Sequence, residues 1–143
     1  ATLPWVAMVD EFQYWIYENK SHSHQERHAA WEKISHRYST GCVDWSSYEE
    51  FYKTAWQRQL HIYEVPFYYI EYGMAQLGAI AVWRNYKKNP KNALDAFDKA
   101  LKLGYTKSIS DIYNAADIKF DFSSNYVREL AVFVKEELLS LNR

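Results

Sequence analysis

Glycine, proline and cysteine are scarce in this sequence, and each scarcity excludes a class of structure. Four glycines and three prolines among 143 residues are too few for an all-β fold with many tight turns. The single cysteine, Cys42, excludes an internal disulfide framework and fits a reducing compartment. The composition therefore predicts an α-helical protein with a cytoplasmic location.

An excess of charge of one sign is also absent. The 17 Lys and Arg residues nearly balance the 18 Asp and Glu residues, which gives a formal net charge of -1. This balance gives no electrostatic reason to expect nucleic acid or an anionic membrane as a partner. Only residues 66–83 approach the length of a membrane span, and Glu71 together with several Tyr and Trp side chains argues against one. We expect neither nucleic-acid binding nor membrane insertion.

Aromatic residues, by contrast, are abundant, with six Trp and thirteen Tyr. A chain of this length can bury about 70% of its unfolded surface, which suffices for one domain with a real core. We predict a single all-α, bundle-like domain over residues 1–143, with about six or seven helices. The sequence opens on Ala1, and apolar periodicity is already present by Trp5. We therefore expect it to be a piece of a longer protein.

Apolar periodicity and capping residues locate the helices of the first half. Trp5, Met8 and Phe12 recur at helical spacing and predict a helix over residues 4–18. A Ser hydroxyl and a Glu carboxylate three residues later satisfy free N–H groups reciprocally at a helix start. Two such capping boxes occur, Ser23 with Glu26 before a helix over residues 24–38, and Ser46 with Glu49 before a helix that ends near residue 59.

Three further helices are predicted after residue 86. Pro90 suits a first helical turn and Gly104 suits the position after the last turn. Ser108 or Ser110 would begin a helix that ends near residue 118, and Ser123 or Ser124 would cap the last one. The positions expected to be buried are Leu94, Phe97, Ala100 and Leu101 in the first of these helices, and Val127, Leu130, Val134, Leu138 and Leu141 in the last.

The stretch from His61 to Trp83 is the expected centre of the fold. Pro66 suits a first helical position, so we predict a helix over residues 66–83, preceded by an extended segment over residues 61–65. Gly73 and Gly78 each cost about 1 kcal/mol in a helix interior relative to Ala. We therefore expect a neighbouring backbone or a ligand to need the room that they leave.

A histidine and four tyrosines at the start of this stretch form the candidate site. Neutral imidazole and phenol groups are donors that can stabilise an oxyanion without changing their own charge, provided that they converge on one cleft. An aromatic core whose hydroxyls bond to the backbone would show the same spacing. The spacing alone therefore leaves both interpretations open for His61, Tyr63, Tyr68, Tyr69 and Tyr72.

His24 and His28 offer a metal site as a competing hypothesis. They stand at i and i+4 on one helical face, which is the spacing that zinc hydrolases use. However, the zincin motif requires Glu directly after the first His, where this sequence has Gln25. The inverted motif requires Glu directly before the second His, where this sequence has Arg27. The sequence also marks no third metal ligand. We interpret the two residues as surface histidines.

The run HIYEVPFYYIEYG, preceded by the stretch Trp56–Gln59, resembles the C-terminal part of oligoendopeptidase F and its thimet-type relatives, which are zinc-dependent oligopeptidases. The opening LPWVAMVDEFQYWIYEN, the following HSHQERHAAW and the closing NPKNALDAFDKALKLGYTKSISDIYNAADI are similar to other segments of the same enzymes. The resemblance covers nearly the whole chain. It implies the C-terminal piece of a larger, mostly helical metallopeptidase that hydrolyses short peptides.

The resemblance also implies roles for the candidate residues. His61, Tyr68 and Tyr69 would stabilise the peptide carbonyl oxygen as it gains charge, and Tyr63 and Tyr72 would hold the substrate. In such enzymes a His-Glu-x-x-His helix and a later glutamate bind zinc, whereas this sequence has no His followed by Glu. We therefore expect zinc to bind upstream of Ala1 in the full-length enzyme. This chain would bind none and would be inactive alone.

The implied partners are short peptide substrates and the upstream part of the same polypeptide. A face left uncovered by that part would expose apolar side chains, such as Trp5 or Trp15, and would allow two copies of the chain to pair. The alternative from another class is a free-standing helical module whose aromatic groove binds a peptide or a small ligand.

Overall fold

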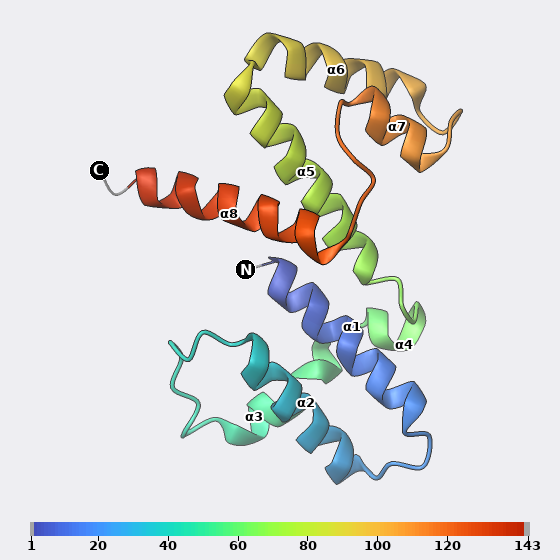
Figure 1. The fold of residues 1–143 in the computed structure, drawn as a ribbon. Coiled ribbons are helices and arrows are strands. Elements are labelled where there is room, and N and C mark those ends of the chain that lie inside the picture. The colour runs from blue at the N-terminus through green and yellow to red at the C-terminus, as the bar shows by residue number, and fades with distance from the viewer. Residues whose placement is uncertain (1, 142–143) are drawn as a thin grey trace. The chain divides into compact units, whose positions relative to one another are not determined.

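The computed structural model describes residues 2–141, and all regular secondary structure within that range is helical. The predicted all-α fold is therefore confirmed. Eight α-helices and one 3-10 helix follow one another along the described chain (Figure 1). Their bounds are α1 Thr2–Glu18, α2 His24–Tyr38, α3 Glu49–Thr54, the 3-10 helix Ala55–Arg58, α4 His61–Glu64, α5 Ile70–Lys88, α6 Pro90–Leu103, α7 Ile109–Ala115 and α8 Ser124–Ser140.

The chain divides into two compact units, Ala1–Gly73 and Met74–Arg143, and the division falls inside α5. The first unit contains α1 to α4 and the first turn of α5. The second contains the rest of α5 and the helices α6 to α8. The single domain expected from the sequence stays a prediction.

The core of the first unit lies between α1 and α2, which a short turn joins (Figure 1). Phe12 of α1 is fully buried, and its ring lies 5.1 Å from that of Trp31 in α2 and 5.4 Å from that of Trp56 in the 3-10 helix. Tilted and edge-to-face rings at such distances stabilise a core beyond the area that they bury. The three aromatic residues therefore hold α1, α2 and the 3-10 helix together.

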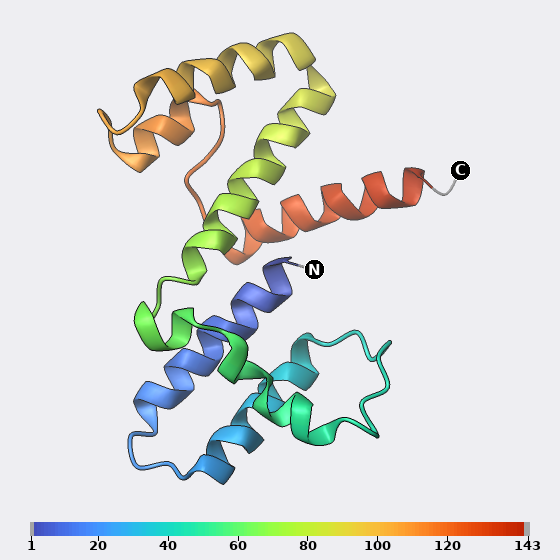
Figure 2. The ribbon, with the colours of Figure 1, turned by 180° about the vertical axis from the view of Figure 1, so that it is seen from behind.

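One of the two predicted capping boxes is confirmed and the other is wrong. Ser23 accepts the Glu26 N–H, and the Glu26 carboxylate accepts the Ser23 N–H, as predicted for the start of α2. At α3 the residue before the helix is Tyr48, which makes no side-chain cap. The Ser46 N–H instead donates to the Asp44 carboxylate at 2.9 Å, so Ser46 belongs to a local turn ahead of the helix. Figure 2 shows the short α3 beside α2, with which it makes contacts.

The predicted central helix begins later than expected. α5 starts at Ile70 rather than at Pro66, because Phe67 has a φ of 63°, which lies in the left-handed region that a right-handed helix excludes. The preceding residues, from His61 to Glu64, form the single helical turn α4 and not the predicted extended segment. The helix-starting preference of Pro66 is thus overridden by the conformation of the residue that follows it.

In the second unit α8 packs against α5. The rings of Trp83 and Phe133 lie 4.8 Å apart, and Leu130 of α8 is fully buried. Lys87 and Glu137 form an ion pair at 2.8 Å between the same two helices. α6 and α7 lie side by side in both views (Figures 1 and 2).

The predicted ends of α6 are confirmed, but most of its predicted buried stripe is exposed. Pro90 begins the helix and Gly104, with a φ of 52°, follows it. Leu94 and Leu101 are 55% and 63% exposed, and of the four predicted positions only Ala100 is buried. The final helix behaves alike, since Leu130 is buried whereas Leu138 and Leu141 are exposed. The apolar pattern therefore identified an apolar face on each helix, but the described residues leave the positions Leu94, Leu101, Leu138 and Leu141 exposed.

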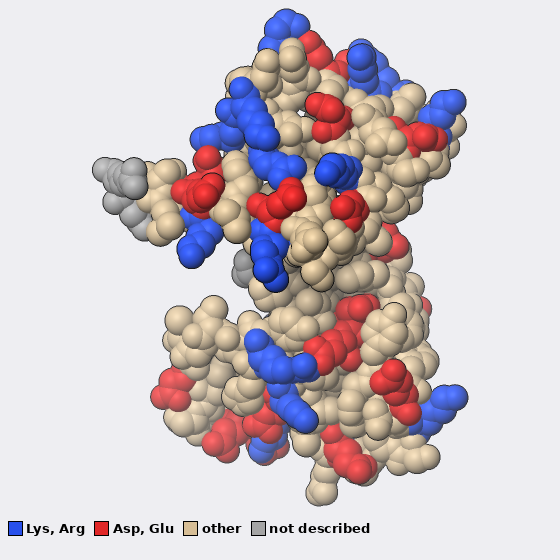
Figure 3. Space-filling model, in the orientation of Figure 1, with Lys and Arg blue, Asp and Glu red and all other residues tan. Residues whose placement is uncertain are grey.

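Charged side chains of both signs are interspersed over the face of the molecule drawn in Figure 3. This mixture fits the nearly balanced composition. Among the described helices none is long and apolar enough to span a membrane.

The two glycines of α5 face side chains, and not the neighbouring backbone that was one of the two expectations from the sequence. A Cβ at Gly73 would lie 3.0 Å from Cγ1 of Val6 in α1. A Cβ at Gly78 would lie 2.8 Å from the hydroxyl oxygen of Tyr113 in α7, which donates to the carbonyl oxygen of Met74 at 3.2 Å. Close packing of α5 therefore explains both glycines.

We predict that Gly78→Ala destabilises the chain, although Ala is normally favoured over Gly in a helix interior by about 1 kcal/mol. The new methyl group would push the rigid Tyr113 ring away, and overpacking of this kind typically costs about 1–3 kcal/mol. Urea unfolding would measure the difference. The same substitution in a Tyr113→Phe background should cost less, because the nearest atom is then gone. An increase in stability on Gly78→Ala would contradict the prediction.

Candidate functional site

The candidate site forms where α4 and the first turn of α5 meet. His61 is the first residue of α4, and Tyr72 lies in the first turn of α5. The His61 ring stands nearly perpendicular to the rings of Tyr69 and Tyr72, at centroid distances of 5.0 and 5.5 Å. Two of the four predicted tyrosines are therefore in direct ring contact with the histidine, in the edge-to-face geometry that aromatic rings prefer.

Tyr68 extends this cluster, whereas Tyr63 lies apart from it. The Tyr68 ring is 5.9 Å from that of Tyr72 and about half exposed. Tyr63 follows His61 by two residues in α4, and residues at that spacing point to different sides of a helix. Its ring stacks on Trp56 at 5.9 Å instead. The structure thus brings Tyr68, Tyr69 and Tyr72 to one side of the histidine and places Tyr63 elsewhere.

The surroundings of Tyr63 shift the pKa of its phenol. Partial burial raises the pKa of Tyr63 above its ordinary value, and the positive charge of nearby Arg27 opposes this rise. The guanidinium carbon of Arg27 lies 5.4 Å from the centre of the Trp56 ring, on which Tyr63 also stacks. Tyr63 is therefore a neutral hydrogen-bond donor at physiological pH.

A chain of hydrogen bonds runs through the cluster and includes two residues that the sequence did not single out as site residues. The indole N–H of Trp5 donates to the Tyr69 hydroxyl at 3.0 Å and to Oε1 of Gln59 at 3.3 Å. Nε2 of Gln59 lies 2.8 Å from Nδ1 of His61, and Nε2 of His61 lies 3.1 Å from the Tyr72 hydroxyl. Gln59 therefore contacts the Nδ1 side of the His61 ring, and Trp5 of α1 contacts Gln59 in turn.

A second contact fixes the turn that carries Tyr68 and Tyr69. Gln13 of α1 is fully buried, and its Oε1 accepts the backbone N–H of Phe67 at 2.8 Å. The Phe67 ring lies 4.9 Å from Tyr14 and 5.1 Å from Tyr17, so α1 also holds the side chain. A left-handed conformation costs an ordinary residue about 1–2 kcal/mol, and these contacts offset that cost.

The cluster presents imidazole and phenol groups to solvent. His61 is half-buried, and Tyr68 and Tyr72 are 51% and 44% exposed. Imidazole and phenol groups can donate hydrogen bonds to an oxygen that gains negative charge without first losing or gaining a proton themselves. Groups of this kind are the donors that an oxyanion site uses.

The residues described by the structure do not fit a zinc site. His24 is exposed, and the half-buried His28 places its ring 6.2 Å from that of Trp56. Over residues 2–141 no group of three or more His, Cys, Asp or Glu side chains could hold a metal ion. No chemical step through a metal can therefore be assigned to these residues.

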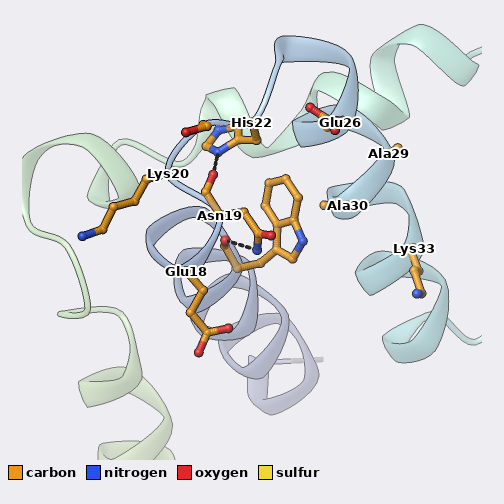
Figure 4. A pocket seen from close by; sticks show the side chains of 10 residues that line it. Glu18, Asn19, Lys20, His22, Glu26, Ala29, Ala30 and Lys33 are labelled. Carbon is orange, nitrogen blue, oxygen red and sulfur yellow. Dashed lines mark hydrogen bonds between the residues drawn. The ribbon is translucent and has the colours of Figure 1, made fainter.

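Among the surface hollows formed by the described residues, two that lie in the first unit bear on the site. One of about 620 Å³ lies at the turn between α1 and α2, where Figure 4 shows polar side chains that bond to their own neighbours; Asn19, for example, donates to the Trp15 carbonyl oxygen at 2.8 Å. The other, of about 630 Å³, is mainly aromatic and includes Trp31 and Trp45. Trp5 and Gln59 line this second hollow as well, so it adjoins the His61 cluster.

A family model for peptidase family M3 matches residues 1–132. The chain belongs to peptidase family M3. The family resemblance inferred from the His61 to Gly73 run is therefore confirmed. A search of the curated proteins found no match.

Two solved structures have the same fold as this chain. One is a PZ peptidase A with an inhibitor, which is 31% identical with a TM-score of 0.85 over 96% of this chain and 25% of its own. The other is a putative oligoendopeptidase F, which is 29% identical with a TM-score of 0.85 over 96% of this chain and 24% of its own. This M3 chain thus spans about a quarter of the length of the peptidases that it resembles.

We predict that Gln13→Met loosens the turn at Phe67. The variant keeps the size of the side chain but removes the acceptor of the Phe67 N–H, and the loss of such a hydrogen bond costs about 1 kcal/mol. Hydrogen exchange should show faster exchange of the Phe67 amide, and urea unfolding a correspondingly lower stability. Gln25→Met, at an exposed position of α2, is the matched control and should change neither quantity. Unchanged protection of Phe67 in Gln13→Met would contradict the prediction.

Proposed function

We propose that this M3 chain supplies one wall of a peptidase active site, in which His61 donates a hydrogen bond to the carbonyl oxygen of the peptide bond that is cleaved. The observation that carries the proposal is the position of His61 Nε2, which lies at the exposed side of the cluster beside the Tyr72 hydroxyl. Membership of a peptidase family supports a peptide as the ligand.

The tyrosines would assist in two ways. The Tyr69 hydroxyl accepts a hydrogen bond from Trp5 and therefore keeps its own proton free to donate. Tyr72, which already contacts His61 Nε2, would share the same peptide oxygen or hold the neighbouring backbone. Tyr68 extends into solvent beside Tyr72 and would contact the substrate chain, as Tyr63 would from the other side of α4.

The finer assignment is a zinc-dependent oligoendopeptidase that acts on short peptides in the cytoplasm. One structural neighbour is described as a putative oligoendopeptidase F, which supports this class. Because the described residues do not fit a zinc site, the proposal places the ligands of the ion elsewhere in the full-length enzyme. This chain then contributes hydrogen bonds to the substrate and no ligand to the metal.

The upstream part of the same polypeptide is the proposed partner of the exposed apolar positions. Leu94, Phe97 and Leu101 are 40–63% exposed in α6, although their spacing is that of a buried stripe. The chain spans about a quarter of its structural neighbours, which supports a larger body that covers such surface. Pairing of two copies through an uncovered face that includes Trp5, which is 37% exposed, is the competing proposal.

The first test is His61→Ala in the full-length peptidase. We expect kcat to fall by about 10²–10³, the usual effect of removing one donor to an oxyanion, with the zinc content unchanged. Peptide hydrolysis and metal analysis on the same preparation would measure both.

His24→Ala is the matched control, because His24 is an exposed histidine of α2 that the proposal does not use. It should retain both activity and zinc. Unchanged turnover in His61→Ala would refute the proposed role and return the cluster to an aromatic core with satisfied hydroxyls.

We also predict that the purified 143-residue chain does not cleave short peptides, with or without added zinc. The sequence holds no His followed by Glu, and the described residues do not fit the metal. A fluorogenic peptide assay with zinc and with a chelator would test this. Zinc-dependent cleavage by the chain alone would overturn the division of roles proposed above.

A free-standing binding module is the second candidate function, and the aromatic hollow of about 630 Å³ beside Trp5 favours it. The coding sequence discriminates between the two. An open reading frame that continues upstream into a His-Glu-x-x-His motif would support the peptidase, and a start codon just before Ala1 would support the module.

A further inference from the structure

We propose that Gln59 is a positioning residue that holds the single proton of neutral His61 on Nε2, the nitrogen on the exposed side of the cluster. Its catalytic consequence rests on the proposed function of His61. The tautomer itself does not, because it can be observed in the chain without any activity.

The orientation of the Gln59 amide follows from Trp5. An indole N–H can only donate, so the atom that it meets must be an acceptor. Oε1 of Gln59 lies 3.3 Å from Nε1 of Trp5, which directs the carbonyl end of the amide toward α1. The amide nitrogen must then point the other way, toward His61.

The protonation of Nδ1 follows in turn. Nε2 of Gln59 lies 2.8 Å from Nδ1 of His61, and an amide NH2 group has no lone pair to accept with. If Nδ1 carried a proton, two donors would face each other at a partly buried contact, which costs the free energy of a lost hydrogen bond in addition to the repulsion. Nδ1 is therefore the acceptor.

A neutral imidazole has one proton, so it resides on Nε2. That nitrogen lies 3.1 Å from the Tyr72 hydroxyl, on the side of the ring that a peptide oxygen would approach. The ring contacts with Tyr69 and Tyr72 fix the plane of the imidazole but cannot select a nitrogen. The polar contact with Gln59 does so from behind the ring.

The backbone holds Gln59 at the required place. Its N–H donates to the carbonyl oxygen of Trp56 at 3.0 Å, and its own carbonyl oxygen accepts the N–H of Ile62 at 3.1 Å. Trp56 and Ile62 are both buried in the core of the first unit. Gln59 therefore lies between two anchored turns, which fixes the starting point of its side chain.

His22 shows the opposite arrangement in the same unit. Its Nδ1 contacts the carbonyl oxygen of Asn19 (Figure 4), and its Nε2 accepts the Nε–H of Arg27 at 2.7 Å. A carbonyl oxygen can only accept and a guanidinium N–H can only donate, so the proton of neutral His22 resides on Nδ1. His22 is an internal reference against which the tautomer of His61 can be read.

The test is ¹⁵N NMR of the imidazoles in the 143-residue chain, at a pH well above the ordinary histidine pKa of about 6.5. We expect the Nε2–H form for His61 and the Nδ1–H form for His22. Gln59→Glu should invert His61 alone, because a carboxylate accepts from both Trp5 Nε1 and His61 Nδ1. His61 remaining in the Nε2–H form in a folded Gln59→Glu chain, with the His22 signals unchanged, would overturn the proposal.

A second measurement is made first on the unaltered chain, so its main result does not depend on the folding of a variant. The hydrogen bond from Gln59 Nε2–H to His61 Nδ1 should give a scalar coupling between the two nitrogens in the unaltered chain. The coupling should be absent in Gln59→Met, which has a similar size but no amide. A His61 Nδ1–H signal in the unaltered chain, without this coupling, would overturn the proposal.

Turnover by the full-length peptidase separates this inference from the proposed function. If the proposed function of His61 and the positioning role of Gln59 both hold, Gln59→Glu lowers kcat by a factor on the order of 10², with KM little changed. The reason is that Nε2 of His61 then presents a lone pair to the substrate oxygen. If His61→Ala leaves kcat unchanged, the proposed function fails while the tautomer assignment stands on the NMR result. If His61→Ala is severe but Gln59→Glu inverts the tautomer with full activity, the positioning role of Gln59 fails.

Discussion

The hydrogen bond between the buried Gln13 side chain and the Phe67 backbone is the constraint on which the site depends. It holds Phe67 in a left-handed conformation, and this ends the turn after α4 and delays the start of α5 to Ile70. Tyr72, in the first turn of α5, lies against His61, with its hydroxyl 3.1 Å from Nε2. Had the helix begun at Pro66, the tyrosines would have been carried on a continuous helix with a different spacing relative to the imidazole. One buried amide in α1 thus sets the geometry of residues more than 50 positions away.

The same helix supports the site a second time, through Trp5. α1 therefore carries the core residue Phe12, the turn anchor Gln13 and the indole that orients Gln59. Trp5, Gln59, His61 and Tyr72 form a chain of hydrogen bonds in which the indole N–H donates to Oε1 of Gln59 and the Gln59 amide nitrogen contacts Nδ1 of His61. Such a chain uses no buried charge, so it avoids the desolvation cost that a charged group would impose at a partly buried site. In the proposed function, the hydrogen-bond donors that this chain presents at the surface meet an oxygen that gains negative charge.

The second unit differs from the first, because its apolar patterns are only partly satisfied. α5 and α8 share a packed contact around Leu130 and Trp83, whereas the exposed leucines of α6 and the end of α8 have no cover among the described residues. This chain spans about a quarter of the length of its structural neighbours, so it contains fewer segments than the whole peptidases with which to cover its apolar faces. Membership of family M3 and the proposed division of roles are consistent with this incomplete coverage.

The sequence by itself determined the helical class, the bounds of α2 with its cap at Ser23, the ends of α6 at Pro90 and Gly104, and the family, because these depend on local hydrogen bonds, periodicity and a contiguous run of residues. It also located His61 and three of its tyrosines. The tertiary structure decided the rest. The start of α5, the separation of Tyr63 from the cluster and the roles of Gln13, Gln59 and Trp5 arise from contacts between residues far apart in the chain. No local propensity encodes which distant glutamine accepts a given N–H. These features therefore depend on how α1 packs against the turn at Phe67.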